Sequence, residues 1–208
     1  MNFFNQLGDF LSNVGEQTTY YTLTQRVDVL YQQGEFEEAI ELAEQSLDLA
    51  RKIWVNEHTN IATSLNKLAF LYQIQGKYSQ AEHLFQQGLA MRKRLFPNVH
   101  LDVAISLNNL ATLYQIQGKY SQAEALFQES LAMYKHLFPN DDINLATMLN
   151  NLAEVYRNQG KYSQAEALFQ ESLAICKRLF PNDNPDVATY LNNLALVYTE
   201  QGKYSQAE

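Results

Sequence analysis

The chain repeats one string of eight residues, Gln-Gly-Lys-Tyr-Ser-Gln-Ala-Glu, four times. The copies begin at Gln75, Gln117, Gln159 and Gln201, always 42 residues apart, and a weaker copy begins at Gln33. A fixed period of this length is typical of a solenoid, in which each unit covers the apolar face of its neighbour. The repeat therefore predicts an extended array, and it favours action through a surface over action through a catalytic pocket.

Each unit carries two helical patterns. One stripe has the spacing i, i+3, i+4, i+7 of an apolar helix face and consists of Leu107, Leu110, Ala111 and Tyr114. A second stripe follows Gly118 and consists of Tyr120, Ala123, Leu126, Phe127 and Leu131. The expected fold class is all-α, with antiparallel helix pairs at about residues 20–61, 62–103, 104–145 and 146–187 and a truncated fifth repeat at 188–208.

Recurring small and polar residues mark the ends of these helices. Glycine, the residue that most readily takes a left-handed backbone, occupies each turn at Gly34, Gly76, Gly118, Gly160 and Gly202. Serines placed three residues before a glutamate predict capping boxes at Ser79, Ser121 and Ser163. Prolines are expected to end the second helices at Pro97, Pro139 and Pro181. The first helix of the next pair is then expected to be capped, or complemented in charge, at its N-terminus. The residues expected to do this are Asn60, Asp102, Asn144 and Asp186.

Both ends of the chain depart from the repeat. Residues 1–15 place Phe3, Phe4, Leu7, Phe10, Leu11 and Val14 on one helical face, with Gly15 as the expected stop. We interpret this segment as an amphipathic helix that caps an array spanning 16–208; the alternative is an autoinhibitory or dimerising segment. At the other end, a partner helix is missing for Leu191, Leu194, Ala195 and Tyr198. The interpretations are a fragment of a longer array, or a face that another chain covers.

Composition narrows the possible partners and locations. Apolar residues make up 46% of the chain and charged residues only 18%, with a net charge of −8, which argues against a general nucleic-acid binder. No apolar run approaches the ~20 residues of a membrane span, and a secretory signal pattern is missing. Cys176 is the only cysteine and lies in an apolar stretch, so it is expected in the core. These features predict a cytoplasmic protein without membrane or nucleic-acid partners.

The block Leu107-Asn108-Asn109-Leu110-Ala111-Thr112-Leu113-Tyr114, followed by Gln117-Gly118-Lys119-Tyr120 and Ala123-Glu124, resembles a tetratricopeptide repeat. The longer unit, against the usual ~34 residues, and the segment Asn184-Pro185-Asp186-Val187-Ala188 resemble the repeats of kinesin light chains and their bacterial relatives. The resemblance covers about residues 20–208. It implies a right-handed superhelix whose first helices line a concave groove for extended peptides. The heptad segment through which kinesin light chains engage the motor is missing, and the regular repeats look more like the bacterial relatives.

The same resemblance selects candidate site residues. The side of the first helix opposite the apolar stripe carries Asn108, Asn109, Thr112 and Gln115, and by resemblance it lines the groove. The corresponding candidates in the other repeats are Asn66, Lys67, Asn150, Asn151, Glu154, Arg157, Asn192 and Asn193. An asparagine amide both donates and accepts, so it suits a peptide backbone; alternatively it is solvated or binds a neighbouring repeat. We call the recurring asparagine and glutamine side chains on this side of the first helices the amide ladder. Partner preference is expected from the charged residues that interrupt it, Lys67, Glu154 and Arg157.

Other recurring residues are expected to serve the core. This applies to Tyr72, Tyr114, Tyr156 and Tyr198, to Tyr78, Tyr120, Tyr162 and Tyr204, and to Trp54, Phe96, Phe138 and Phe180. The histidines, His58, His83, His100 and His136, lack the spacing of a helical metal site, and neither a nucleophile elbow nor a phosphate loop occurs. We therefore expect no enzyme activity, no metal and no cofactor.

The sequence favours a protein-interaction scaffold that binds a peptide segment of a partner in the concave groove. One alternative is a structural array that assembles with itself, through the N-terminal helix or the open C-terminal face. Another is a regulatory or sensor arm of a larger multidomain protein. The sequence does not identify the partner.

Overall fold

A computed structural model describes residues 3–138, 142–180 and 185–207, with side chains described for 13–138, 142–180 and 187–206. These residues form helices only: α1 (Phe3–Gln33), α2 (Phe36–Ile53), α3 (Thr59–Ile74), α4 (Tyr78–Leu95), α5 (Leu101–Ile116), α6 (Tyr120–Leu137), α7 (Ile143–Asn158), α8 (Tyr162–Leu179), α9 (Pro185–Glu200) and α10 (Tyr204–Ala207). We call the odd-numbered helices first helices and the even-numbered ones second helices. The chain divides into two compact units, Met1–Pro97 and Asn98–Glu208.

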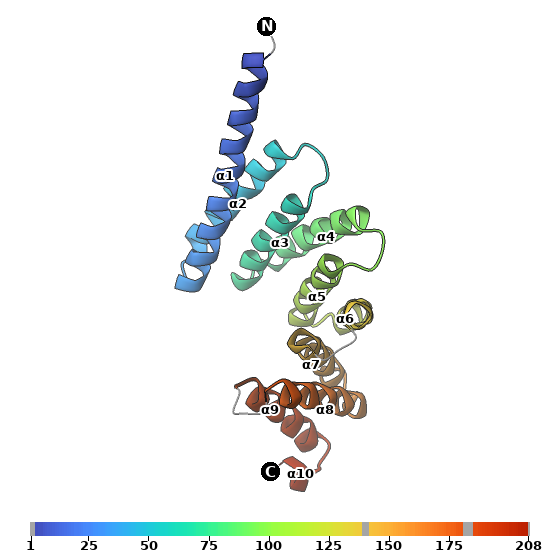
Figure 1. The fold of residues 1–208 in the computed structure, drawn as a ribbon. Helices are drawn as coiled ribbons and strands as arrows, with labels where there is room; N and C mark the ends of the chain where they lie inside the picture. The colour runs from blue at the N-terminus through green and yellow to red at the C-terminus, as the bar shows by residue number, and fades with distance from the viewer. Residues whose placement is uncertain (1–2, 139–141, 181–184, 208) are drawn as a thin grey trace. The chain divides into compact units, whose positions relative to one another are not determined.

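Within each unit, consecutive helices pack against one another. In the first unit, α2 packs between α1 and α3, and α3 also packs on α4. In the second unit, α6 packs between α5 and α7, and α8 packs between α7 and α9. Figure 1 shows the members of each pair joined by a short turn. The predicted all-α array of antiparallel helix pairs is confirmed.

The turn inside each pair depends on a glycine with a left-handed backbone. Gly118 has φ 72°, and the corresponding glycines have φ between 73° and 80°. The Gly118 N–H donates to the Gln115 carbonyl at 3.0 Å, and the Lys119 N–H donates to the Tyr114 carbonyl at 2.8 Å. These two bonds form a Schellman motif, which satisfies the last carbonyls of α5. The predicted role of these glycines is confirmed.

The predicted capping boxes are wrong. Ser79, Ser121 and Ser163 are the second residues of their helices, and the N-cap residues are lysines without a side-chain cap bond. The reason is the preceding turn, which starts the helix only two residues after the glycine. The glutamate three residues on from Ser121, Glu124, instead accepts hydrogen bonds from the next repeat.

The first helices are capped two residues earlier than predicted. The N-caps are His58, His100 and Asp142, whose side chains accept from the backbone N–H of Asn60, Asp102 and Asn144 at 3.1, 3.1 and 2.7 Å. Asn60, Asp102 and Asn144 are thus not caps, although Asp102 complements the positive end of α5 as an acidic residue of its first turn. The fourth predicted cap, Asp186, has no described side chain.

The predicted core is mostly confirmed. Leu107, Leu110, Ala111 and Cys176 are buried. In the first tyrosine ladder Tyr72, Tyr114 and Tyr156 are buried and Tyr198 is half-buried. The second tyrosine ladder lies only partly in the core, because Tyr120 and Tyr162 are half-buried, whereas Tyr78 is 38% exposed and Tyr204 is 66% exposed. Each tyrosine of this ladder is the first residue of its second helix, at an end that solvent reaches. Trp54, Phe96 and Phe138 are half-buried and Phe180 is exposed, since each follows the last turn of a second helix.

The first helix does not stop at Gly15. α1 continues without interruption to Gln33 and supplies Tyr20, Val27 and Leu30 to the core of the first pair. Apolar contacts from residue 20 onward hold this helix, and a single glycine inside it costs too little to end it. The expected apolar stripe from Phe3 to Leu11 lies outside the described side chains, and Val14 is exposed.

Successive copies of the repeated string bind one another. The first and third residues of one string, Gln159 and Lys161, donate to Glu124, the last residue of the preceding string, at 2.9 and 2.8 Å. The Lys161 ammonium also lies 5.2 Å from the centre of the Tyr156 ring. The next junction repeats the pattern, because Lys203 pairs with Glu166 at 2.8 Å and lies over Tyr198. We call this chain of contacts the lysine–glutamate ladder.

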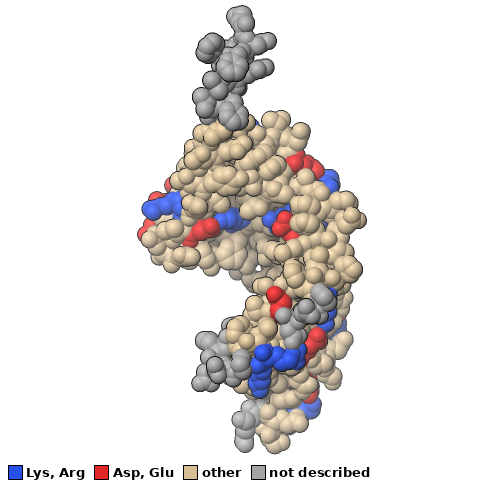
Figure 2. Space-filling model, in the orientation of Figure 1, with Lys and Arg blue, Asp and Glu red and all other residues tan. Residues whose placement is uncertain are grey.

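The ladder shifts the pKa of its carboxylates. Burial raises the pKa of Glu124, but the hydrogen bonds from Lys161 and Gln159 outweigh burial and hold that pKa below its ordinary value. For Glu166, the hydrogen bond from Lys203 is the largest influence and again lowers the pKa. On the face drawn in Figure 2, basic and acidic side chains lie in small mixed groups with uncharged surface between them.

Two glycine substitutions should have opposite effects on stability. Gly118→Ala forces a side chain into a left-handed backbone and should cost about 1 kcal/mol of unfolding free energy. Gly15→Ala should stabilise by about 0.5–1 kcal/mol, because Gly15 is helical and a Cβ there has open space. Urea denaturation measures both, and loss of stability in Gly15→Ala would contradict a continuous α1.

The ladder should contribute more than an ordinary surface ion pair. Lys161→Met should cost about 1 kcal/mol at neutral pH, through the lost ion pair and the lost contact with Tyr156. Because the pKa of Glu124 is lowered on folding, its stabilisation is present above the ordinary glutamate pKa and is lost as pH falls through the folded-state value. Denaturation from pH 7 down to acid should therefore show the cost shrinking.

The matched control is Lys135→Met, which removes an exposed ion pair with Glu171. It should change stability by less than about 0.5 kcal/mol. Equal effects of the two substitutions would contradict a special role for the ladder.

Candidate functional site

The predicted site residues lie along the first helices, on a surface that we call the first-helix face. In the second unit, α7 contacts both α5 and α9, so candidates from three helices come together. They are Gln115 of α5, Asn150 and Glu154 of α7, and Asn193 of α9. The sequence placed these residues on a common face but did not predict their mutual contacts.

Glu154 is the acceptor at the centre of this group. Gln115 Nε2 donates to Glu154 Oε2 at 2.9 Å, and Asn150 Nδ2 donates to Glu154 Oε1 at 3.4 Å. Asn193 Nδ2 donates to Asn150 Oδ1 at 2.8 Å and approaches Glu154 Oε1 at 3.5 Å. We call these four residues the Glu154 network.

The network gives part of the amide ladder a structural role. Asn150 is buried, and its amide both donates and accepts within the network. Glu154 stands where α3, α5 and α9 have the non-ionic residues Phe70, Thr112 and Leu196, whereas α1 has Asp28 there. A single carboxylate therefore draws amide donors from three helices together, as the alternative interpretation of the asparagines expected.

In the first unit, the equivalent positions of the repeat carry different residues and make different contacts. Asn66 is buried beside Gly88, where an added Cβ would approach its Oδ1 atom to 2.6 Å, so the missing side chain makes room for this amide. Lys67 forms an ion pair with Asp28 of α1. Close by, Tyr31 of α1 and Phe70 of α3 pack edge to face with ring centres 5.4 Å apart.

Sequence reasoning missed Asp28 and Tyr31. Both lie two periods before candidate positions, since Asp28 corresponds to Thr112 and Tyr31 to Gln115. Extending the repeat back into α1 would have found them. The first-helix face of this unit is therefore aromatic and charged, whereas that of the second unit is rich in amides.

The remaining candidates lie outside the Glu154 network. Asn109 and Asn151 are half-buried, Asn192 is exposed, and Arg157 pairs with Glu200 at 3.4 Å. The Thr112 hydroxyl donates to the Asn108 carbonyl, one turn earlier in α5, at 3.0 Å.

Asn108 lines a pocket of about 330 Å³ between α5 and α7. Its walls are Leu101, Ile105, Asn108, Tyr134, Asn144, Thr147 and Met148. The Asn108 Oδ1 atom is enclosed and accepts no hydrogen bond from a described residue. The pocket thus combines an apolar lining with an amide that has unused hydrogen-bonding capacity.

The Tyr134 hydroxyl at this pocket is held by Asp142, the N-cap of α7. It donates to Asp142 Oδ1 at 2.7 Å. Burial, followed by the hydrogen bond to Asp142, raises the pKa of Tyr134, and the same bond is the largest cause that lowers the pKa of Asp142. The tyrosine therefore stays protonated, and the bond to Asp142 holds its side chain in place at the pocket lining.

The described part of the chain supports neither a metal site nor a membrane-spanning helix. It contains no group of three or more His, Cys, Asp or Glu side chains arranged to hold a metal ion. None of its helices combines the length and apolar character needed to cross a membrane.

Removing the central carboxylate should weaken the second unit. Glu154→Leu, which introduces the residue found at position 196, leaves the donors of Gln115 and Asn150 without their acceptor and should cost about 1–2 kcal/mol. Asn151→Ala on the same helix is the control and should change stability by less than about 0.5 kcal/mol. Thermal or urea unfolding compares the two, and equal costs would contradict the network.

Comparison with known proteins bears on the fold. A tetratricopeptide repeat model matches residues 18–94 and 144–208, and a second tetratricopeptide repeat model matches residues 103–144. No curated protein matches the sequence.

Several solved structures share the fold. A putative kinesin light chain from Podosopora anserina with nearly identical TPR-like repeats is 24% identical, covers 90% of this chain and 89% of its own, and has a TM-score of 0.78. BtubC (BKLC) from P. vanneervenii is 21% identical over 97% of this chain and 80% of its own, with a TM-score of 0.84. A Rap protein complexed with competence and sporulation factor is 18% identical over 90% of this chain and 50% of its own, with a TM-score of 0.73. With family models matching most of its length, the chain belongs to the tetratricopeptide repeat family.

Proposed function

We propose that this protein is an interaction scaffold that binds a peptide segment of a partner protein on its first-helix face. Tetratricopeptide repeats generally serve as protein-interaction scaffolds, which supports the broader part of the proposal. The solved Rap protein of the same fold was complexed with competence and sporulation factor, which supports a binding role for such arrays.

The observation that carries the proposal is the pocket between α5 and α7. Its apolar walls, Leu101, Ile105 and Met148, can bury an apolar side chain of the partner. Rotation of the Asn108 amide about its last side-chain torsion would present a donor and an acceptor to the partner's backbone. Burial of the partner's apolar side chain would supply the affinity, and hydrogen bonds to the Asn108 amide would set the orientation of the peptide.

Other amides extend this surface beyond the pocket. Asn109 and Asn151 are half-buried and Asn192 is exposed, so their amides are accessible to a chain lying along the first helices. We expect affinity on the order of micromolar for a short peptide, because ordering the peptide offsets much of the contact free energy.

Two exposed isoleucines of α5 make a matched test. Ile105 lies in the pocket and is 39% exposed, whereas Ile116 lies outside it and is 49% exposed. Ile105→Lys should place a charge in the pocket and weaken partner binding by at least about tenfold, while Ile116→Lys should leave it within about twofold. Both variants should fold, because both positions face solvent.

Affinity capture from an extract of the source organism, followed by mass spectrometry, supplies candidate partners. Isothermal titration with the captured segment then compares wild type, Ile105→Lys and Ile116→Lys. A partner that binds all three equally would place the function on another surface and contradict the proposal.

A further inference from the structure

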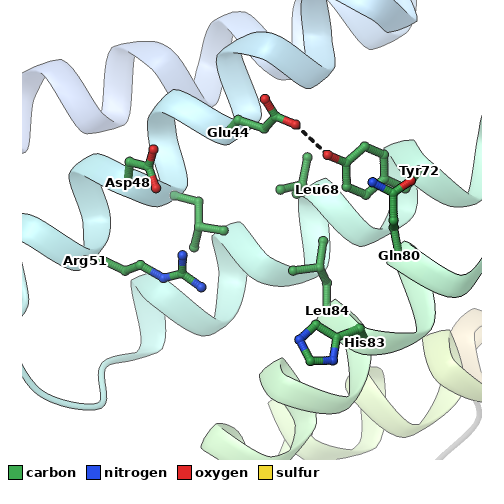
Figure 3. Close-up of a pocket in the computed structure, with 9 residues that line it drawn as sticks. Glu44, Asp48, Arg51, Leu68, Tyr72, Gln80, His83 and Leu84 are labelled. Atoms are coloured by element: carbon green, nitrogen blue, oxygen red, sulfur yellow. Dashed lines mark hydrogen bonds between the residues drawn. The ribbon is translucent and has the colours of Figure 1, made fainter. Parts of the chain in front are cut away.

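A second pocket lies in the first unit, against the second helices. It has a volume of about 380 Å³ and is lined by residues of α2, α3 and α4 (Figure 3). Its lining is apolar at Leu47, Leu68 and Leu84. Figure 3 shows Glu44 and Asp48 extending from α2 at one side and His83 from α4 at the other.

The internal repeats show what is unusual about this pocket. Glu44 stands where the other second helices have Gln86, Gln128 and Gln170, and Asp48 stands where they have Ala90, Ala132 and Ala174. The apolar lining is common to the array, since Leu47 corresponds to Leu89, Leu131 and Leu173. The two carboxylates, and His83 in place of Ala125 and Ala167, therefore distinguish this pocket from the same surface of the other repeats.

The added carboxylate reverses a hydrogen bond of the array. In the second unit Gln128 Nε2 donates to the Tyr156 hydroxyl at 2.8 Å, and Gln170 Nε2 donates to the Tyr198 hydroxyl at 3.0 Å. In the pocket the Tyr72 hydroxyl is the donor and Glu44 is the acceptor. Burial, followed by the contact with Glu44, raises the pKa of Tyr72 to about 12, so this donor is retained at neutral pH.

The carboxylates retain capacity for a further donor. Tyr72 occupies one oxygen of Glu44, and no described lysine or arginine pairs with Glu44 or Asp48. The two acidic residues are one helical turn apart and both exposed, so they face the same space. Arg51 also lines the pocket, but basic residues at this position recur as Lys93, Lys135 and Lys177. The positive charge is thus general to the array, and the negative charge is specific to this pocket.

We propose that this pocket receives a lysine or arginine side chain of a partner protein. The aliphatic part of the side chain would pack on Leu47, Leu68 and Leu84, and its cationic head would bind the carboxylates of Glu44 and Asp48. The net charge of −8 favours approach of a basic segment to this surface. The proposed site involves none of the first-helix residues assigned to peptide binding, so it would be a second docking surface.

Labelled pentapeptides test the proposal directly. One peptide carries arginine between two leucines, and its counterpart carries citrulline, which has the same shape without the charge. Fluorescence polarisation should show that the arginine peptide binds at least about fivefold more tightly than the citrulline peptide. Similar affinities for the two peptides would overturn the proposal.

The repeats themselves provide the variants. Glu44→Gln with Asp48→Ala introduces the residues of the other second helices and should weaken the arginine peptide by about tenfold. Glu37→Ser with Glu41→Ala is the control: it removes the same charge from exposed positions of α2 and introduces the residues of α6 and α8. Binding should stay within about twofold of wild type in this control.

Circular dichroism should show both double variants folded, since every introduced residue already occupies the corresponding position of a helix in this chain. Equal weakening in the two variants would mean that only the overall negative charge attracts the peptide, and it would overturn the pocket as the site. Selective weakening in the Glu44→Gln, Asp48→Ala variant would support it. Neither result depends on the first-helix face, because all four substitutions lie on α2.

Discussion

Burial of a first helix between two second helices is the interaction on which this structure depends. In the second unit, α7 packs against α6 on one side and α8 on the other, and its Leu149, Leu152 and Tyr156 are all buried. A single pair of helices could cover only one side of such a stripe. Every other feature, from the glycine turn to the surfaces proposed to bind partners, is positioned by this repeated contact.

Much of the architecture could be predicted because it depends on features that recur with the period. Helix pairs, left-handed turn glycines and the buried Leu107 and Tyr114 all follow from spacing and backbone sterics. Helix starts were predicted less well, because capping depends on which acceptor reaches an amide first. His58 and His100 fill that role although histidine is an uncommon cap, and Ser121 loses it because the turn starts the helix too early.

The candidate site shows a different limit. Spacing alone placed Asn108, Asn150 and Asn193 on a common face, but it could not tell a free amide from one bound to a neighbour. That distinction rests on a carboxylate at position 154 and on the missing side chain at Gly88, whose effects reach across helices. Repeats that are nearly identical in sequence therefore present different surfaces, and a few substitutions give each unit its own chemistry.

The lysine–glutamate ladder has a consequence for how such an array can change in length. Each string carries both halves of the junction, the donors Gln159 and Lys161 at its start and an acceptor such as Glu166 at its end. A duplication or deletion of one whole period would join the same donors to the same acceptor, and no new interface would have to evolve. Recombination between repeats could therefore lengthen or shorten the array in whole steps, and the specific residues of each unit would move with it.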